Sequence, residues 1–289
     1  MIPAAFEYFT PSTLSEAIAL LEEHGDEAKI LSGGHSLIPM MRYRLASPEK
    51  IVDINGIPDL EYIKEEDGYL KIGGLTREVA LEDTPMIREK YPLLYDTAIM
   101  IADPQVRNVA TIGGNIAHGD AANDHPATML ALGAEVVATG PNGERVIPID
   151  DFFLGLYYTA LEPSEIITEI RIPAADGNSS GTYKKMERKV GDYATAAVAV
   201  QVTMNGSGPA KVGIGLTNVG PTPIRAKRSE ELLVGKPITD ELIKEAGKLA
   251  SEDCSPTADL RGSEEYKRSV VSVLTQRALK IAFERALSS

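Results

Sequence analysis

Two glycine doublets constrain this chain more than any other feature. Gly33-Gly34 and Gly113-Gly114 lie about eighty positions apart, and each follows a β-rich run and has small polar neighbours. Adjacent glycines let successive backbone N–H groups point into one concavity, which suits phosphate oxygens. Ser36, Thr111 and Asn115 can add side-chain donors. Either doublet alone is better explained as a tight turn, but the two together favour a ligand that carries a diphosphate.

The familiar nucleotide-binding motifs are not matched elsewhere in the chain. Gly213-Ile214-Gly215 is followed by Asn218, where a dinucleotide fingerprint has its third glycine. Gly235-Lys236 is followed by Pro237, where a phosphate-binding P-loop needs Ser or Thr. These departures argue against a Rossmann dinucleotide fold and against an NTPase.

One polar segment has the composition of a metal site. His118, Asp120, Asp124 and His125 lie within eight positions and could together ligate a divalent ion. The simpler interpretation is a polar loop that ends in Asp124 as the N-cap of a helix. In that loop Asp124 could still accept a hydrogen bond from a ribose hydroxyl. A non-redox metal-binding or assembly protein that uses these four residues is therefore kept as an alternative.

A basic run precedes a tyrosine in the second half of the chain. Residues of one parity share a face of a strand, so Lys184 and Arg188 are expected to point together. A cation there could neutralise negative charge on a flavin or a phosphate, although a solvated strand face explains the run equally well. Tyr193 could lie against an aromatic ring, but an isolated Tyr is more often a packing residue.

Charge and cysteine content exclude several classes of protein. The net charge is −13, from 29 Lys+Arg and 42 Asp+Glu, which argues against nucleic-acid binding as the main role. The one cysteine, Cys254, cannot hold an iron–sulfur cluster or a Cys-rich zinc site. The N-terminal residues lack a signal-peptide pattern, and no apolar run approaches the roughly 20 residues of a membrane span. These observations predict a cytosolic protein.

Periodicity predicts three groups of elements along the chain. Over 1–57 it predicts a helix capped by Thr13 and strands at 29–31 and 51–54. Over 58–176 it predicts hairpins at Asp67-Gly68 and Asn142-Gly143, helices between 87 and 99 and from Asp124, a strand-like run at 105–112 and a strand at 164–172. After a linker-like stretch at 176–181 come strands at 182–188, 196–204 and 210–216, then helices near 239–252 and 263–287. Strands followed by helices predict a separate α+β unit.

Four motifs in order resemble one known family. SGGHS, QVRNVATIGGNIAHGDAANDHPA, KKMERKVGDYA and DLRGSEEYKRSVV are similar to the flavoprotein (medium) subunit of molybdenum hydroxylases, of the carbon monoxide dehydrogenase type in the xanthine dehydrogenase family. The resemblance covers essentially the whole chain. It implies an α+β protein with a vanillyl-alcohol-oxidase-like (PCMH-type) FAD-binding domain at 1–176, in subdomains of about 1–57 and 58–176. A smaller α+β domain would follow at 177–289.

The resemblance also implies a set of residues that bind FAD. Ser32 stands where the family usually has Ala, and Asp124 matches an acidic residue near the ribitol or ribose. Lys184 matches a lysine near the isoalloxazine ring and Tyr193 a residue that covers one flavin face; these two would tune the flavin, and no residue of the chain is assigned as catalytic. The implied set is Ser32, Gly33, Gly34, His35, Ser36, Ile101, Thr111, Ile112, Gly113, Gly114, Asn115, Asp124, Ile167, Lys184 and Tyr193.

The implied function is electron transfer within a complex. FAD would take electrons from a 2Fe–2S small subunit and pass them to a quinone, O2 or NAD, while a molybdopterin large subunit oxidises the substrate. The expected assembly is a dimer of heterotrimers in the cytoplasm, with a peripheral position on the inner face of the membrane as a further option. No metal, nucleic acid or membrane span is assigned to this chain. A free-standing flavin oxidase of the same fold is the main alternative.

Overall fold

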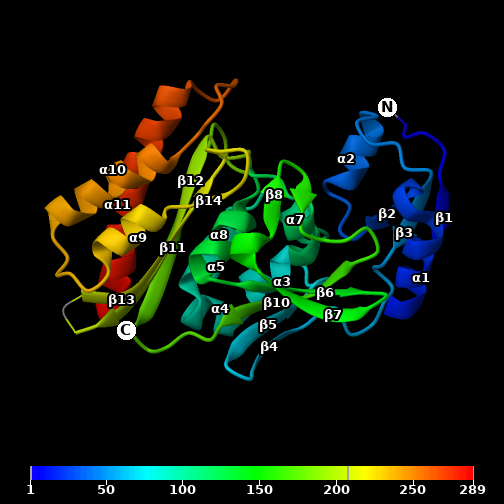
Figure 1. The fold of residues 1–289 in the computed structure, drawn as a ribbon, viewed down its shortest axis with the longest axis horizontal. Helices are drawn as coiled ribbons and strands as arrows, with labels where there is room; N and C mark the ends of the chain where they lie inside the picture. Colours follow the sequence, from blue (N-terminus) through cyan, green and yellow to red (C-terminus); the bar gives the residue numbers. More distant parts are fainter. Residues whose placement is uncertain (1, 207, 289) are drawn as a thin grey trace.

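The computed structural model describes residues 2–206 and 208–288 as three lobes in a row (Figure 1). The N-terminal lobe is a parallel sheet of β1 (Glu7–Phe9), β2 (Ala28–Leu31) and β3 (Lys50–Asp53), in the order β1-β3-β2. Its helices are α1 (Leu14–His24) and α2 (Leu37–Arg42), with a 3-10 turn, η1 (Gly25–Glu27), between α1 and β2. As predicted, Thr13 caps α1 by accepting the amide of Glu16, and an apolar face of α1 is buried against the sheet.

The middle lobe is built on a five-stranded antiparallel sheet with the order β4-β5-β10-β6-β7. Its strands are β4 (Ile63–Glu66), β5 (Tyr69–Gly73), β6 (Glu135–Gly140), β7 (Gly143–Pro148) and β10 (Ile166–Pro173). Both predicted hairpins are present. One face of the sheet packs on helices α3 (Glu78–Asp83), α4 (Pro85–Lys90), α5 (Pro92–Ala98), α7 (Ile112–Ala117) and α8 (Asp124–Leu132).

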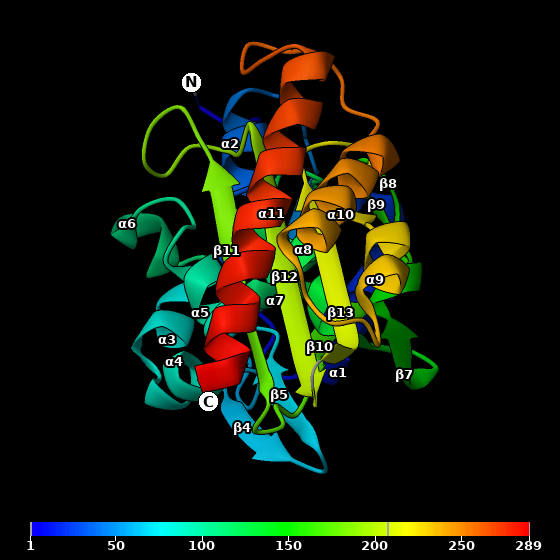
Figure 2. The ribbon, with the colours of Figure 1, turned by 90° about the vertical axis from the view of Figure 1, so that its left-hand side faces the viewer.

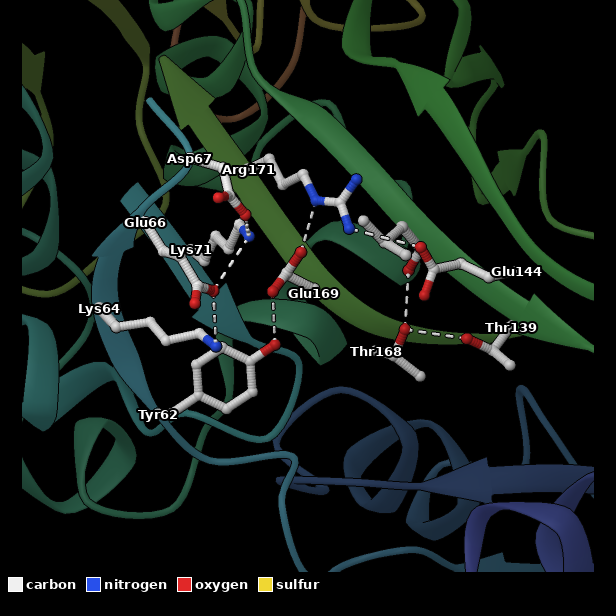
Figure 3. A network of polar contacts seen from close by, with 11 residues as sticks. Tyr62, Lys64, Glu66, Asp67, Lys71, Thr139, Glu144, Thr168, Glu169 and Arg171 are labelled. Carbon is white, nitrogen blue, oxygen red and sulfur yellow. Dashed lines mark hydrogen bonds and ion pairs between the residues drawn. The ribbon is translucent and has the colours of Figure 1, made fainter. Parts of the chain in front are cut away.

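The other face of this sheet is polar (Figure 3). The Tyr62 hydroxyl donates to Glu169 at 2.6 Å, and Arg171 pairs with the same carboxylate from its other side. Burial and the hydrogen bond to Glu169 raise the pKa of Tyr62 well above its usual value. Because these side chains are hydrogen-bonded or ion-paired with one another, we assign no ligand site to this face.

The prediction of a strand at 105–112 is wrong. This run forms a short helix, α6 (Pro104–Arg107), and then a loop that enters α7. The carboxylate of Asp103 accepts the amide of Val106, and Pro104 occupies the first helical position, so local capping outweighs the β-branched residues that follow. The second glycine doublet therefore lies in the first turn of a helix.

The C-terminal lobe is a four-stranded antiparallel sheet, β11 (Ser179–Met186), β12 (Ala196–Asn205), β13 (Gly208–Thr217) and β14 (Ile224–Arg225). Three helices, α9 (Lys227–Leu233), α10 (Asp240–Asp253) and α11 (Glu264–Ser288), cover its outer face (Figure 2). The three long strands and the last two helices match the prediction; β14 and α9 were not predicted.

The inner face of this sheet packs directly on α8 of the middle lobe. A Cβ atom added at Gly213 or Gly215 would lie 1.9 Å from the carbonyl oxygen of Ala131 or Ala127, respectively. Glycine is therefore needed at both positions because helix and strand backbones touch. The Gly-Ile-Gly segment that resembled a failed dinucleotide fingerprint is a packing feature.

A small hairpin, β8 (Phe153–Gly155) and β9 (Tyr158–Thr159), follows the 3-10 turn η2 (Ile149–Asp151). Tyr157, at its tip, has a positive φ of 56° and donates its amide to the carbonyl of Gly119 at 3.0 Å. This contact places the hairpin beside the loop that leads into α8.

Candidate functional site

A cavity of about 600 Å³ is lined by residues of all three lobes. Thirteen of the fifteen residues expected to bind FAD line it: Ser32, Gly33, Gly34, His35, Ser36, Ile101, Thr111, Gly113, Gly114, Asn115, Asp124, Ile167 and Tyr193. The two exceptions are Ile112, which is fully buried in the core of the middle lobe, and Lys184. The fold thus brings both glycine doublets to one cavity.

The first glycine loop has the free amides that the sequence predicts. Within residues 2–206 and 208–288, the backbone N–H groups from Gly33 to Leu37 have no hydrogen-bond partner. Gly34 has a φ of +74°, which lets the chain curl so that adjacent amides can converge. Five consecutive unpaired amides at a cavity wall could bind an anion.

The second loop differs from the expectation that both doublets offer free amides. The amides of Ile112 and Gly113 donate to the carbonyls of Thr76 and Gly74, and those of Gly114 and Asn115 donate to Thr111. The physical reason is that these residues form the capped first turn of α7. This loop instead presents the side chain of Asn115, whose Oδ1 is buried and lacks a partner among the described residues. A buried amide oxygen without a donor can accept a hydrogen bond from a ligand or a water molecule at this position.

The two loops touch each other. The hydroxyls of Ser32 and Thr111 lie 2.7 Å apart, and a Cβ atom added at Gly33 would lie 2.6 Å from the Cα of Ala110. Gly33 therefore lets the two backbones approach, and the Ser32–Thr111 hydrogen bond joins them.

A buried cluster of charged and polar groups lies beside the loops. Asp124 is the first residue of α8 rather than its N-cap, which is Asn123. Its carboxylate accepts hydrogen bonds from the Tyr183 hydroxyl at 2.7 Å and from Lys185 Nζ at 3.0 Å. Lys185 Nζ also donates to the carbonyl of Met100 at 3.1 Å, and its side chain is only 1% exposed. Burial raises the pKa of the Asp124 carboxyl, and Lys185 and Tyr183 oppose that rise. Burial also raises the pKa of Tyr183 well above its usual value, so its hydroxyl stays protonated and donates.

Of the two adjacent lysines of β11, Lys185 lines the cavity and the predicted Lys184 does not. In β11, Tyr183 pairs with Ala199 on the side of the sheet that faces α8, whereas Lys184 pairs with Val198 on the side that faces α11. Side chains do alternate between the two faces of this strand, as the prediction assumed. The prediction was wrong about which of the two lysines points toward the cavity. The sequence analysis did not assign Tyr183 or Lys185 to the site. Their face of the strand is identified by the buried apolar residues that neighbour Tyr183 on the adjacent strand, and a single strand does not reveal which residues these are.

Tyr193 stands at the rim of the cavity, partly exposed. Burial raises its pKa to about 12, so the phenol is neutral at ordinary pH. The Arg261 guanidinium lies 5.9 Å from the centre of its ring and donates to Asp192 at 2.9 Å. The DLRG segment of the C-terminal lobe thereby holds the loop that carries Tyr193. Sequence reasoning noted that motif but gave it no role.

The four candidate metal ligands do not converge. His125 is fully buried and contacts Glu78 at 2.7 Å, while His118 stacks on Tyr157 with ring centroids 4.9 Å apart. Burial lowers the pKa of His118, which lines the cavity as a neutral ring. Over the described part of the chain, no group of three or more His, Cys, Asp or Glu side chains could hold a metal ion. Among the described residues, these four side chains therefore form no metal site that would support the metal-binding alternative.

The cavity has the chemistry that an FAD molecule requires. Free amides suit the diphosphate, the Asp124 carboxylate and the Asn115 amide suit hydroxyl-bearing groups, and Ile101 and Ile167 supply apolar wall. The residues present fit this cofactor. Within the described residues, no helix is long and apolar enough to cross a membrane.

Comparisons with known proteins show which proteins the chain is similar to. A family model described as the FAD binding domain in molybdopterin dehydrogenase matches residues 4–175, and one described as the CO dehydrogenase flavoprotein C-terminal domain matches 181–282. The chain is 46% identical to the carbon monoxide dehydrogenase medium chain of Hydrogenophaga pseudoflava, over 99% of each chain. It is 37% identical to the glyceraldehyde dehydrogenase medium chain of Sulfolobus acidocaldarius, over 97% of this chain and 99% of the relative.

A solved structure shows the same arrangement. Carbon monoxide dehydrogenase from Hydrogenophaga pseudoflava contains a chain that matches with a TM-score of 0.97 and 47% sequence identity, over 99% of both chains. The likeness therefore extends across all three lobes.

Proposed function

The chain belongs to the family of FAD-binding medium subunits of carbon monoxide dehydrogenase and related molybdenum hydroxylases, and from this we propose that it carries electrons between a partner 2Fe–2S subunit and an external acceptor. It is an oxidoreductase subunit with FAD as its cofactor. The observation that carries the proposal is the row of unpaired amides from Gly33 to Leu37, which shares its cavity with the unpartnered Oδ1 of Asn115.

Each residue of the cavity has a distinct task in this proposal. FAD, when bound, supplies the redox chemistry. The amides of the first loop bind the diphosphate, and Asp124 accepts a hydrogen bond from a ribitol or ribose hydroxyl. Lys185 pairs with Asp124 and places a cation at the cavity wall, and Tyr193, which lines the cavity, would cover one face of the isoalloxazine ring.

We assign the fold to the vanillyl-alcohol-oxidase-like (PCMH-type) class. The separate sheets of the first two lobes support subdomains of about 1–57 and 58–176, and the third sheet supports a C-terminal domain at 177–289. The family models, which end at 175 and begin at 181, fit this division.

We further propose that the chain works with two partner subunits, a small iron–sulfur chain and a large molybdopterin chain, as a dimer of heterotrimers. Its single cysteine, Cys254, is buried, and burial raises its pKa to about 12, so this thiol is unsuited to cluster ligation. The quinone, O2 or NAD acceptor, and the cytoplasmic or membrane-peripheral location, stay predictions that cell fractionation and acceptor assays can test. The relatives are named for different substrates, so the substrate belongs to the large partner.

The test is reduction of the flavin with and without partners. We expect the full chain in its complex to contain one FAD that is reduced by the substrate of the complex, and the isolated FAD-loaded chain to be inert toward organic donors. Direct reduction of the isolated chain by an organic donor would instead support the free-standing oxidase. Absence of flavin absorbance from the complex would contradict the proposal.

A further inference from the structure

Asn55, the second residue after β3, joins the backbone of the first glycine loop to the side chain of Arg77. Its Nδ2 donates to the carbonyl of Ser32 at 2.8 Å and to Asp53 Oδ1 at 2.6 Å, and its Oδ1 accepts a hydrogen bond from Arg77 at 2.8 Å. Asn55 lies at the surface, where water could satisfy an amide. Three protein partners immobilise it instead, and the entropy lost by fixing a surface side chain indicates that the position matters.

Arg77 continues the connection into the second loop. Its guanidinium donates to the carbonyl of Val109, and its backbone forms a bridge with Thr111. The side chains of Asn55 and Arg77 therefore connect two carbonyl groups, that of Ser32 just before the first doublet and that of Val109 shortly before the second. We call this pair the Asn55–Arg77 clamp.

The clamp acts on the amides through peptide geometry. In a planar trans peptide the C=O and the N–H point in opposite directions. Because Asn55 holds the carbonyl of Ser32, the N–H of Gly33 must point away from Asn55. Gly33 lines the cavity, and its N–H has no partner among the described residues. A flexible glycine loop is thereby kept in one orientation before any ligand arrives.

We propose that Asn55 and Arg77 are positioning residues that hold the first glycine loop ready to bind the diphosphate of FAD. Neither residue lines the cavity. The inference rests on the proposed role of that loop, and it adds that preorganisation by the clamp, rather than contact with FAD, sets part of the affinity.

The test measures FAD affinity in the full chain within its complex. We expect Asn55→Ala to weaken FAD binding about tenfold, because the loop must then be ordered by the ligand. Arg77→Ala should weaken it similarly, and the double variant should be little worse than either, because both changes break one connection. Arg268→Ala is the matched control, since it removes a guanidinium-to-carbonyl bond, to Ser251 at 3.0 Å, in the C-terminal lobe and away from both glycine loops.

Asn55→Asp separates positioning from a general structural role. Aspartate keeps an acceptor for Arg77 but loses the donor toward Ser32, so we expect it to weaken FAD binding as Asn55→Ala does. Wild-type affinity in Asn55→Asp would overturn the proposal. Equal weakening of FAD and of riboflavin, which lacks the diphosphate, would overturn it too.

A crystal structure of Asn55→Ala provides a readout that does not depend on flavin. We expect the Ser32–Gly33 peptide to leave its wild-type orientation, and an unchanged peptide would contradict the clamp. If the wild-type complex contained no FAD, the proposed function would fail, whereas this structural readout would still decide whether the clamp orients the loop.

Discussion

Lys185 donates a hydrogen bond to Asp124 at 3.0 Å, across the contact between the C-terminal sheet and the middle lobe. Asp124 begins α8 in the FAD-binding domain, and Lys185 lies on the first strand of the following sheet. The carboxylate that faces the cavity thus depends on a cation from the other domain.

Replacement of Lys185 by Met should destabilise the chain and weaken FAD binding. It leaves Asp124 buried without its cation, a change that costs about 3–5 kcal/mol in comparable buried pairs. Lys184→Met is the control, because its side chain lies on the opposite face of β11. Urea unfolding and FAD titration of both variants check the prediction. Equal effects of the two substitutions would contradict the assignment of Lys185.

Gly33→Ala should separate the two loops. The new methyl group would lie 2.6 Å from the backbone of both Ala110 and Val109, and backbone atoms cannot move aside cheaply. We expect a large loss of FAD content together with a lower melting temperature. Gly177→Ala, where nothing lies within 4 Å, should change neither.

Thr111→Val should lower the free energy of unfolding by about 1–2 kcal/mol. The valine lacks the hydroxyl that caps α7 through Gly114 and that bonds Ser32 at 2.7 Å. Thr111→Ser keeps the hydroxyl and should retain most of the stability. Chemical denaturation of the two variants makes the comparison, and equal losses would show that the methyl group matters more than the bond.

The stability of the chain should depend on pH through His118. Burial lowers the pKa of His118 below its usual 6.5, and Asp120 opposes this shift. The unfolded chain therefore takes up the proton first as the pH falls. The free energy of unfolding should drop as the pH decreases from about 6.5 toward the lower folded pKa, with no contribution from His118 above that window. His118→Gln should show a flatter profile in melting curves between pH 5 and 7 if this shift is responsible.

Arg261→Gln should speed the release of FAD. The substitution removes the ion pair with Asp192 and the cation from the ring of Tyr193, contacts worth on the order of 0.5–1 kcal/mol each. A few-fold faster dissociation is expected in stopped-flow fluorescence. Arg228→Gln, which breaks an exposed ion pair with Asp253, should leave the rate unchanged.

Most of the helices and strands that were predicted correctly could be identified from residues close together in the sequence. The helix capped by Thr13, the two hairpins at Asp67-Gly68 and Asn142-Gly143, and the long C-terminal strands all depend on residues close in sequence. The run at 105–112 failed because Asp103 and Pro104 begin a helix just before it. The short elements β14 and α9 carry too few residues for a periodic pattern.

The part of the site formed by the two glycine doublets could be predicted from the sequence. The polar residues beside each doublet were enough to predict that both doublets lie at one ligand site. They could not show which amides are free, because the amide of Gly113 donates to the carbonyl of Gly74, which is distant in sequence. The choice between Lys184 and Lys185 likewise depends on which face of β11 meets α8. The Asn55–Arg77 clamp joins side chains from two lobes, a relationship that no single segment reveals.

The contact of α8 with Gly213 and Gly215 has a consequence for chimeric chains. Because carbonyl oxygens of the helix lie against the backbone of β13, any second half joined to this first half must carry glycine at both positions. A chimera that joins the first half of this chain to the second half of a relative would tolerate no side chain larger than a hydrogen atom at those two positions. The contact between α8 and β13 therefore limits which second halves can be joined to this chain.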